Sequence, residues 1–186
     1  MKIAVTGSIG SGKSMVCQYL ARKGYSLFDC DEENRKLLEK GEEGYLAIRE
    51  AFPECFDGEE LNKKKLASIV FDDEKEKRKL EGICHPLILK RLMERKEDPL
   101  FAEVPLLFEA GWEKYFDHDL LVVTDYDLLM ERLQERGLSL EEAKERFSRQ
   151  MSVEEKIKRA DKIIYNNGSL DELYERVDEW LEELKC

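Results

Sequence analysis

The segment from residue 3 to residue 14 constrains the fold of this chain more than any other part of it. An apolar run at residues 3–5 leads directly into the octapeptide GSIGSGKS of residues 7–14, which matches the pattern G-x-x-x-x-G-K-[ST] at every required position. Glycine lets successive backbone N–H groups point into such a loop without a Cβ clash, and the helix that follows adds the partial positive charge of its N-terminus. The segment therefore predicts a buried strand, a phosphate-binding loop and a helix, in that order.

This loop indicates that the chain binds ATP or GTP. Lys13 is expected to bridge the β- and γ-phosphates, and the Ser14 hydroxyl is expected to be a ligand of Mg²⁺. The alternative is a glycine-rich turn that opens an ordinary helix, and the order of strand, loop and helix argues against it. The residues expected to bind the nucleotide here are Gly10, Ser11, Gly12, Lys13, Ser14 and Met15.

Apolar runs and helical patterns alternate along the rest of the chain, which predicts an α/β fold. Several of the runs are apolar without alternation, as in strands that are buried on both faces of a parallel sheet. Strands that alternate with helices form βαβ units, so we predict a five-stranded parallel sheet flanked by helices. The predicted strands are residues 2–6, 25–28, 100–108, 120–124 and 162–165. The predicted helices are residues 14–23, 31–40, 61–71, 73–95, 126–136, 140–150, 153–160 and 170–184.

Two of the crossovers are much longer than one helix requires. We interpret residues 31–98 as an insertion that binds a second substrate and residues 137–160 as a lid, both within a single domain that spans residues 1–186. The core is then formed by residues 1–30, 99–136 and 161–186.

Composition excludes several classes of protein. The 186 residues carry 31 Lys and Arg against 42 Asp and Glu, a formal net charge of −11, which argues against a general nucleic-acid binder. No apolar run approaches the roughly 20 residues that cross a bilayer, and the apolar part of the N-terminus is too short for a signal peptide. Five cysteines without a metal-binding spacing are expected to be reduced thiols. The chain is therefore expected to be cytoplasmic, with no membrane or nucleic-acid partner.

The remaining motifs favour a small kinase among the nucleotide-binding proteins. A GTPase switch should carry N-K-x-D late in the chain, and the only Asn-Lys pair, Asn62-Lys63, lacks the Asp. A kinase must bind a second substrate beside the γ-phosphate and exclude water. The alternatives are another small-molecule or nucleoside monophosphate kinase and a nucleotide-binding regulatory protein without transfer chemistry.

Two regions suit the acceptor and the lid. Asp31 comes just after a predicted strand, where its carboxylate can accept the proton of an acceptor hydroxyl, although Asp is equally common as a helix cap. Residues 146–159 hold five basic side chains against two acidic ones, which suits a lid that closes on phosphates. The alternative for any single one of these residues, Arg146 included, is a solvated helical face with ion pairs.

Separated motifs in the same order resemble the dephospho-coenzyme A kinase family, which is related to the nucleoside monophosphate kinases. The resemblance runs from residue 2 to about residue 177 and implies a P-loop kinase fold. It rests on the phosphate loop, on Asp29-Cys30-Asp31 with Arg35, on His85-Pro86, on the VPLLFE segment of residues 104–109 and on a closing run. That closing run contains Arg146, Gln150, Lys156, Ala160-Asp161 and Asn166-Asn167-Gly168.

The resemblance also implies the reaction and the roles of individual residues. The γ-phosphoryl group of MgATP would pass to the 3′-hydroxyl of dephospho-CoA, a small-molecule substrate, in the last step of CoA biosynthesis. Lys13, Asp31 and Arg146 would be catalytic, and Asn166–Gly168 would lie beside the adenine, with Asn167 as a nucleotide-binding residue. The residues that would bind dephospho-CoA are Asp31, Arg35, His85, Pro105, Leu106 and Glu109. This chain departs from the family pattern at Met15, at Cys30 and after Arg136, where an Asp is often found.

Overall fold

The computed structural model describes residues 1–184, and Lys185 and Cys186 lie outside the described part. The chain divides into two compact units. Unit 1 comprises Met1–Phe28 and Glu97–Cys186, and unit 2 comprises Asp29–Lys96.

Unit 1 contains the sheet, whose strand order is β2-β5-β1-β6-β7. β1 lies at the centre and runs parallel to both neighbours, with Val5 opposite Glu103 on one side and Leu120 on the other. The carboxyl ends of β1, β5 and β6 therefore meet at one edge of the sheet, where ligands of open α/β sheets bind. This confirms the predicted five-stranded parallel sheet. The strands are β1 (Lys2–Gly7), β2 (Ser26–Asp29), β5 (Leu100–Glu103), β6 (His118–Val123) and β7 (Lys162–Tyr165).

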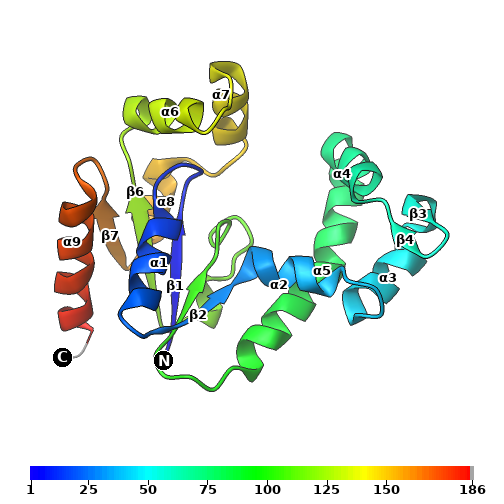
Figure 1. Ribbon diagram of the computed structural model, residues 1–186, viewed down its shortest axis with the longest axis horizontal. Helices are drawn as coiled ribbons and strands as arrows, with labels where there is room; N and C mark the ends of the chain where they lie inside the picture. The colour runs from blue at the N-terminus through cyan, green and yellow to red at the C-terminus, as the bar shows by residue number, and fades with distance from the viewer. Residues whose placement is uncertain (185–186) are drawn as a thin grey trace. The chain divides into compact units, whose positions relative to one another are not determined.

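Helices cover the sheet because its strands are apolar on both faces. Ile3, Val5 and Phe101 face a core cluster that includes Val16 of α1 and Trp180 of α9, so α1 and α9 cover one face. In Figure 1, α6 and α7 lie beyond the carboxyl ends of β1 and β6. The helices of unit 1 are α1 (Lys13–Arg22), α6 (Tyr126–Glu135), α7 (Leu140–Ser148), α8 (Val153–Arg159) and α9 (Leu170–Glu183), with a short 3-10 helix at Glu113–Tyr115.

One predicted strand is shorter in the structure than in the prediction. The apolar run of residues 100–108 forms a strand only as far as Glu103, and residues 105–111 form turns. Pro105 has no backbone N–H to donate to a ladder, while Leu107 and Phe108 are buried in the turns instead. The run is apolar because it is buried, and burial alone does not distinguish a strand from a turn.

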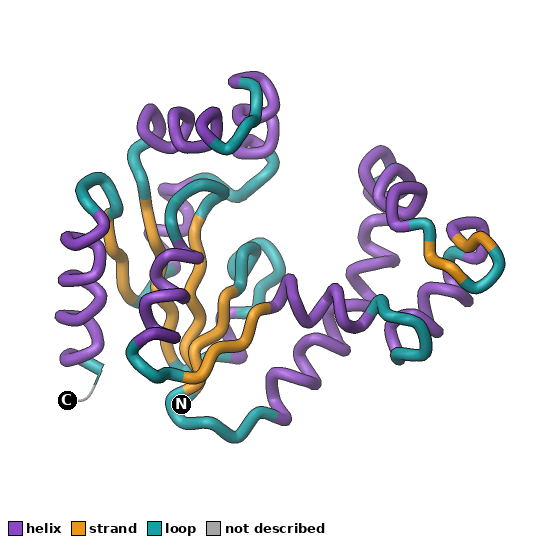
Figure 2. Tube along the Cα trace, viewed as in Figure 1, coloured by secondary structure: helices purple, strands orange, loops and turns teal. Residues whose placement is uncertain are grey.

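Unit 2 is built from helices and one small hairpin. Figure 2 shows β3 and β4 as a short pair of strands among these helices. The helix α3 and the strand β3 fall within residues 41–60, where no element was predicted, and β4 ends at Leu61, where a helix was predicted to begin. The elements are α2 (Cys30–Leu37), α3 (Glu43–Ala51), a 3-10 helix at Pro53–Cys55, β3 (Phe56–Asp57), β4 (Glu60–Leu61), α4 (Lys63–Asp72) and α5 (Glu74–Glu94).

Two further expectations concern the whole chain. Cys17, Cys30, Cys55 and Cys84 are buried thiols, and the fifth cysteine, Cys186, lies outside the described residues. No helix within residues 1–184 combines the length and the apolar character that a membrane span requires.

Candidate active site

The phosphate loop runs from the end of β1 to the start of α1, as the sequence predicts. Gly10 and Gly12 have positive φ angles of 82° and 99°, which residues with a Cβ rarely adopt. A Cβ on Gly12 would collide with the side-chain amide of Asn166, and a Cβ on Gly10 would lie 3.1 Å from Leu133 of α6. Both glycines are therefore required by the backbone and by the close approach of other elements.

Buried polar side chains from neighbouring strand ends hold this loop. Asn166 Nδ2 donates to the Ser11 carbonyl at 2.8 Å, and the Thr124 hydroxyl lies 3.0 Å from the same oxygen and 3.2 Å from the Asn166 carbonyl. Arg132 donates to Thr124 Oγ1 at 3.3 Å. The Ser11 hydroxyl is buried and has no hydrogen-bond partner among the described residues. The loop conformation is thus fixed by the polar ends of β6 and β7.

Ser14 lies beside an acidic residue that was not predicted to be part of the site. Its hydroxyl donates to Glu103 Oε1 at 2.6 Å. Glu103 is the last residue of β5, the neighbour of β1, so the parallel register places its carboxylate at the start of α1. Among the described residues, no cluster of three or more His, Cys, Asp or Glu side chains could hold a metal ion. The two oxygens are hard ligands of the kind that Mg²⁺ prefers, and they fit an ion that arrives with a nucleotide.

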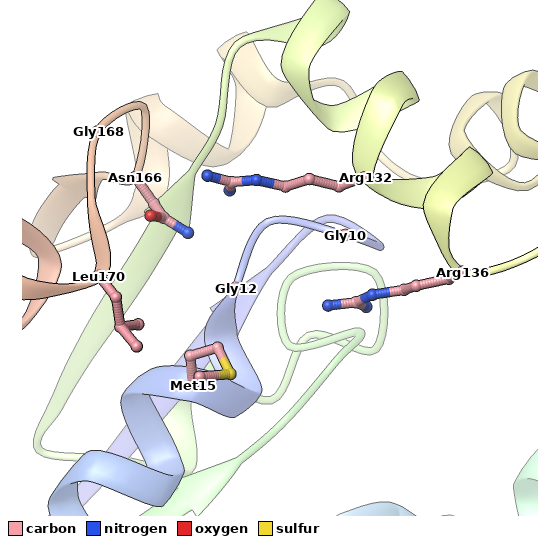
Figure 3. Close-up of a pocket in the computed structure, with 8 residues that line it drawn as sticks. All are labelled: Gly10, Gly12, Met15, Arg132, Arg136, Asn166, Gly168 and Leu170. Carbon is pink, nitrogen blue, oxygen red and sulfur yellow. The ribbon is translucent and has the colours of Figure 1, made fainter.

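A pocket of about 170 Å³ lies next to the loop (Figure 3). Figure 3 shows Arg132 and Arg136 extending from the end of α6 toward the loop. Met15 and Leu170 add apolar surface to the same pocket. Two guanidinium groups beside the glycine-rich loop suit a polyanion, and the apolar side chains suit a flat base. The full lining is Gly10, Gly12, Met15, Arg132, Arg136, Asn166, Gly168 and Leu170.

Asn167, the middle residue of the segment Asn166–Gly168 that was predicted beside the adenine, is not among the residues that line this pocket. Its Oδ1 accepts the backbone N–H of Asp125 at 2.9 Å and so joins the ends of β6 and β7. The pocket is lined by the neighbouring Asn166 and Gly168.

Arg146 lies on α7, where its side chain is exposed. The segment after α7 returns to the phosphate loop, because Gln150 Oε1 accepts the backbone N–H of Ile9 at 3.0 Å. α7 is packed on α6 through an apolar cluster of Leu129, Leu133 and Ala143, to which Ile9 also adds its side chain.

The segment of residues 105–109 follows β5 in unit 1. Leu106 is exposed, and Pro105 and Glu109 are half-buried. Glu109 Oε1 accepts the Met151 N–H at 3.0 Å and lies 2.9 Å from Lys156 Nζ. These three predicted acceptor-binding residues therefore belong to a turn rather than to a strand end.

In unit 2, Asp31 is not the helix cap that the sequence allowed. Asp29 caps α2, since its Oδ1 accepts the N–H groups of Asp31 and Glu32, both at 2.9 Å. Asp31 stands in the first turn and is exposed. The cap alternative for Asp31 is therefore wrong, because the first N–H groups of the helix already have an acceptor.

The other unit 2 candidates lie on two helices. Arg35 follows Asp31 by four residues on α2, so both are on one side of that helix. Asn34 lies three residues after Asp31, and its Oδ1 is buried without a hydrogen-bond partner among the described residues. His85 is in the middle of α5, and burial lowers its pKa while the charge of Glu81 opposes this shift. A neutral imidazole is therefore favoured at pH 7.

Comparison with known proteins identifies the family. The family model described as "Dephospho-CoA kinase" matches residues 1–172. The chain belongs to the dephospho-CoA kinase family. Among relatives of that name, the Thermus thermophilus protein is 41% identical over 98% of this chain and 91% of its own length. The Aquifex aeolicus protein is 38% identical over 98% and 97%. The chain is accordingly a phosphotransferase of the final step of CoA biosynthesis.

Solved structures place this dephospho-CoA kinase in the P-loop kinase fold. A Thermus thermophilus protein superposes with a TM-score of 0.87 at 37% identity, over 99% of this chain and 97% of that one. The dephospho-CoA kinase of Campylobacter jejuni gives a TM-score of 0.74 at 30% identity, over 99% and 98%. Shikimate kinase from Acinetobacter baumannii shares the fold alone, with a TM-score of 0.59 at 19% identity over 98% and 92%.

Sequence reasoning missed Glu103 and Arg132 near the phosphate loop of unit 1, and it missed Asn34 in unit 2. Glu103 and Arg132 were not singled out, although Glu103 lies within the predicted strand of residues 100–108 and Arg132 lies in the predicted helix after the fourth strand. Glu103 could have been found from its position, because it is a carboxylate within an apolar run that pairs with β1. Asn34 gave no signal, because a single polar residue between charges is typical of an exposed helix.

Proposed function

We propose that Lys13, Asp31 and Arg146 carry the transfer of the γ-phosphoryl group of ATP to the 3′-hydroxyl of dephospho-CoA. The observation that supports this most directly is the phosphate loop of unit 1, with Lys13 at the start of α1 and Ser14 beside Glu103. Lys13 neutralises the transferred phosphoryl group as charge develops on it, and Arg146 adds a second cation from the lid. Asp31 orients the acceptor hydroxyl and takes its proton.

Mg²⁺ fits the oxygens of Ser14 and Glu103. Ser14 would hold the ion through its hydroxyl, and Glu103 would hold it through an ordered water. The bound ion would supply positive charge that offsets the charge of the nucleotide phosphates. Glu103→Gln is expected to raise the Mg²⁺ concentration that gives half-maximal ADP release, by about tenfold, the usual effect of an outer-shell partner. An unchanged Mg²⁺ dependence argues against this assignment.

The nucleotide is proposed to bind in the pocket of Figure 3. Gly10, Ser11 and Gly12 face the phosphates, and Met15 and Leu170 provide an apolar surface for the base. Asn167 contributes through the loop that it fixes to Asp125. Arg132 in the last turn of α6 and Arg136 directly after it line the same pocket. Their guanidinium groups balance the charge of the phosphates.

Acceptor binding is proposed for six residues. Arg35 suits the anionic groups of dephospho-CoA, and neutral His85 suits a hydrogen bond to its sugar or base. The full set is Asp31, Arg35, His85, Pro105, Leu106 and Glu109. The cytoplasmic location inferred from the sequence remains a prediction.

Asp31→Asn tests the catalytic proposal. Asn has the same size and cannot accept the proton, so kcat is expected to fall by roughly 10²- to 10⁴-fold, with a smaller fall where proton transfer comes late. The assay is coupled ADP release with dephospho-CoA. The control is Glu32→Gln, which removes a neighbouring exposed carboxylate of the same helix turn that pairs with Lys36. Equal turnover of Asp31→Asn and the unmodified enzyme sinks the role of Asp31.

Arg146→Ala tests the lid. If the Arg146 cation acts in the transition state, its removal should lower kcat by about 10²-fold or more and should change the affinity for ATP less. Equal loss in both parameters indicates ordinary ground-state binding instead.

A further inference from the structure

A fully buried lysine stands in α8, away from the phosphate loop. Lys156 has 0% of its surface exposed, and its ammonium lies 2.9 Å from Glu109 Oε1. The Glu109 side chain is itself only 19% exposed. A buried charge pair is expensive to form and often stabilises less than apolar side chains of the same volume. A buried ion pair is therefore weak evidence of a contribution to stability, and another role for this pair has to be tested.

The same carboxylate oxygen also holds the backbone of the lid segment. Glu109 Oε1 accepts the N–H of Met151 at 3.0 Å, just where the chain leaves α7. The preceding residue, Gln150, accepts the N–H of Ile9 in the phosphate loop at 3.0 Å. Two consecutive residues thus attach the end of α7, one to the phosphate loop and one to the turn after β5.

The position of α7 depends on these attachments because its apolar packing is local. Leu129, Met130, Leu133 and Ala143 form a cluster of their own, separate from the core of the sheet. Ile9 packs against that cluster, so the loop and the lid share both an apolar and a polar contact. The charge pair of Glu109 and Lys156 fixes α8 to the same carboxylate that holds Met151.

We propose that Glu109 and Gln150 are positioning residues that anchor the base of the lid to the phosphate loop. They act on phosphoryl transfer through Ile9, Met151 and Lys156 rather than by contact with ATP. The kinetic test of this proposal assumes the role proposed above for Arg146 in the lid. The test by hydrogen–deuterium exchange does not depend on that role.

Four variants separate positioning from simple stability. Glu109→Gln removes the charge that pairs with Lys156, and Gln150→Leu removes the acceptor for Ile9 at a half-buried position. The double variant Glu109→Leu with Lys156→Met replaces the ion pair by apolar side chains and is expected to melt near the unmodified enzyme. The matched control is Glu113→Gln, since Glu113 pairs with Arg159 at the other end of α8, in a more exposed pair.

Glu109→Gln, Gln150→Leu and the double variant are each expected to lower kcat by about 10- to 100-fold, the effect of a misplacement of about 1 Å. The KM for dephospho-CoA should stay unchanged in Gln150→Leu, since Gln150 is not among the proposed acceptor-binding residues, and Glu113→Gln should behave as the unmodified enzyme. A double variant that recovers both its melting temperature and its kcat overturns the proposal, because the pair then serves stability alone. For Glu109, which is also a proposed acceptor-binding residue, a raised KM for dephospho-CoA at unchanged kcat overturns the positioning role and leaves only the acceptor contact.

Hydrogen–deuterium exchange without substrates tests the anchor directly. Amides of residues 146–152 should exchange faster in Glu109→Gln and in Gln150→Leu, while those of α9 keep their rates. Gln150→Leu breaks one hydrogen bond at a half-buried site, so it decides the question if the buried-pair variants do not fold. Unchanged exchange at residues 146–152 in Gln150→Leu overturns the proposal, whatever the kinase assay shows.

Discussion

At the scale of single residues, Asp119 at the start of β6 is the clearest source of pH dependence. It is 4% exposed, and burial raises its pKa to about 6, with Asp161 and Glu113 adding negative charge nearby. Asp119 and Asp161 exchange hydrogen bonds, because each carboxylate accepts the other's backbone N–H at 3.1 Å. The folded state therefore holds the Asp119 proton more tightly than the unfolded state, whose pKa is near 3.8.

The free energy of unfolding should consequently fall as the pH rises from about 4 to about 6, and the cost of the buried charge is complete above that window. Asp119→Asn keeps an oxygen for the Asp161 N–H and removes the charge. We expect it to raise the free energy of unfolding at pH 7.5 by up to about 3 kcal/mol, since one pKa unit corresponds to ~1.4 kcal/mol. At pH 4 it should change little. Thermal melts at the two pH values check this, and an equal effect at both would show that the charge is not the cause.

At the scale of elements, the phosphate loop depends on the backbone of Gly12. Gly12→Ala should weaken ATP binding strongly, because the new methyl group meets Asn166 and displaces the bond that holds the Ser11 carbonyl. Gly24→Ala is the matched control, since Gly24 also has a positive φ, 90°, and has no atom within 4 Å of the added Cβ. Both variants bear a backbone strain of about 1–2 kcal/mol. Calorimetric titration with ATP should show the loss in Gly12→Ala alone, and a similar loss in Gly24→Ala would contradict the collision.

Elements that carry a strong pattern were predictable from the sequence, and short ones were not. The phosphate loop and the strand Lys162–Tyr165 were predicted correctly because one has a fixed spacing and the other is a bounded apolar run. The helix α3 was missed, although Tyr45, Ile48 and Phe52 form an apolar stripe, because Gly44 interrupts its first turn. The cap of α2 is Asp29, two residues before Asp31, for which a cap role was one of two alternatives; both are good caps, and only the backbone bonds distinguish them. The contacts of Glu103 with Ser14 and of Glu109 with Lys156 join distant segments, and no local pattern predicts them.

At the scale of the whole molecule, the predicted nucleotide and acceptor residues are divided between two compact units. Lys13 and the pocket next to it belong to unit 1, and Asp31 belongs to unit 2. ATP at 100 times its dissociation constant stabilises a protein by about 2.7 kcal/mol. This stabilisation is measured as a rise in melting temperature on addition of ATP. We expect the rise to persist in Asp31→Asn and to be largely lost in Lys13→Ala, with both variants folded in the absence of ATP. Loss of the rise in Asp31→Asn would place that carboxylate among the ATP contacts.

β7 is an edge strand of the sheet, so its outer side can meet other copies of the chain at high concentration. A strand with its outer backbone groups unused can recruit an identical strand from another molecule and start aggregation. On β7, Arg176 donates to the carbonyl of Tyr165, and Lys162 is held by Glu183 of α9. A guanidinium already occupies one outward carbonyl, and a charged side chain flanks the strand at its start. These contacts protect the apolar pair Ile163-Ile164 from edge-to-edge pairing, so the edge of the sheet helps to keep each copy of the enzyme separate while it folds.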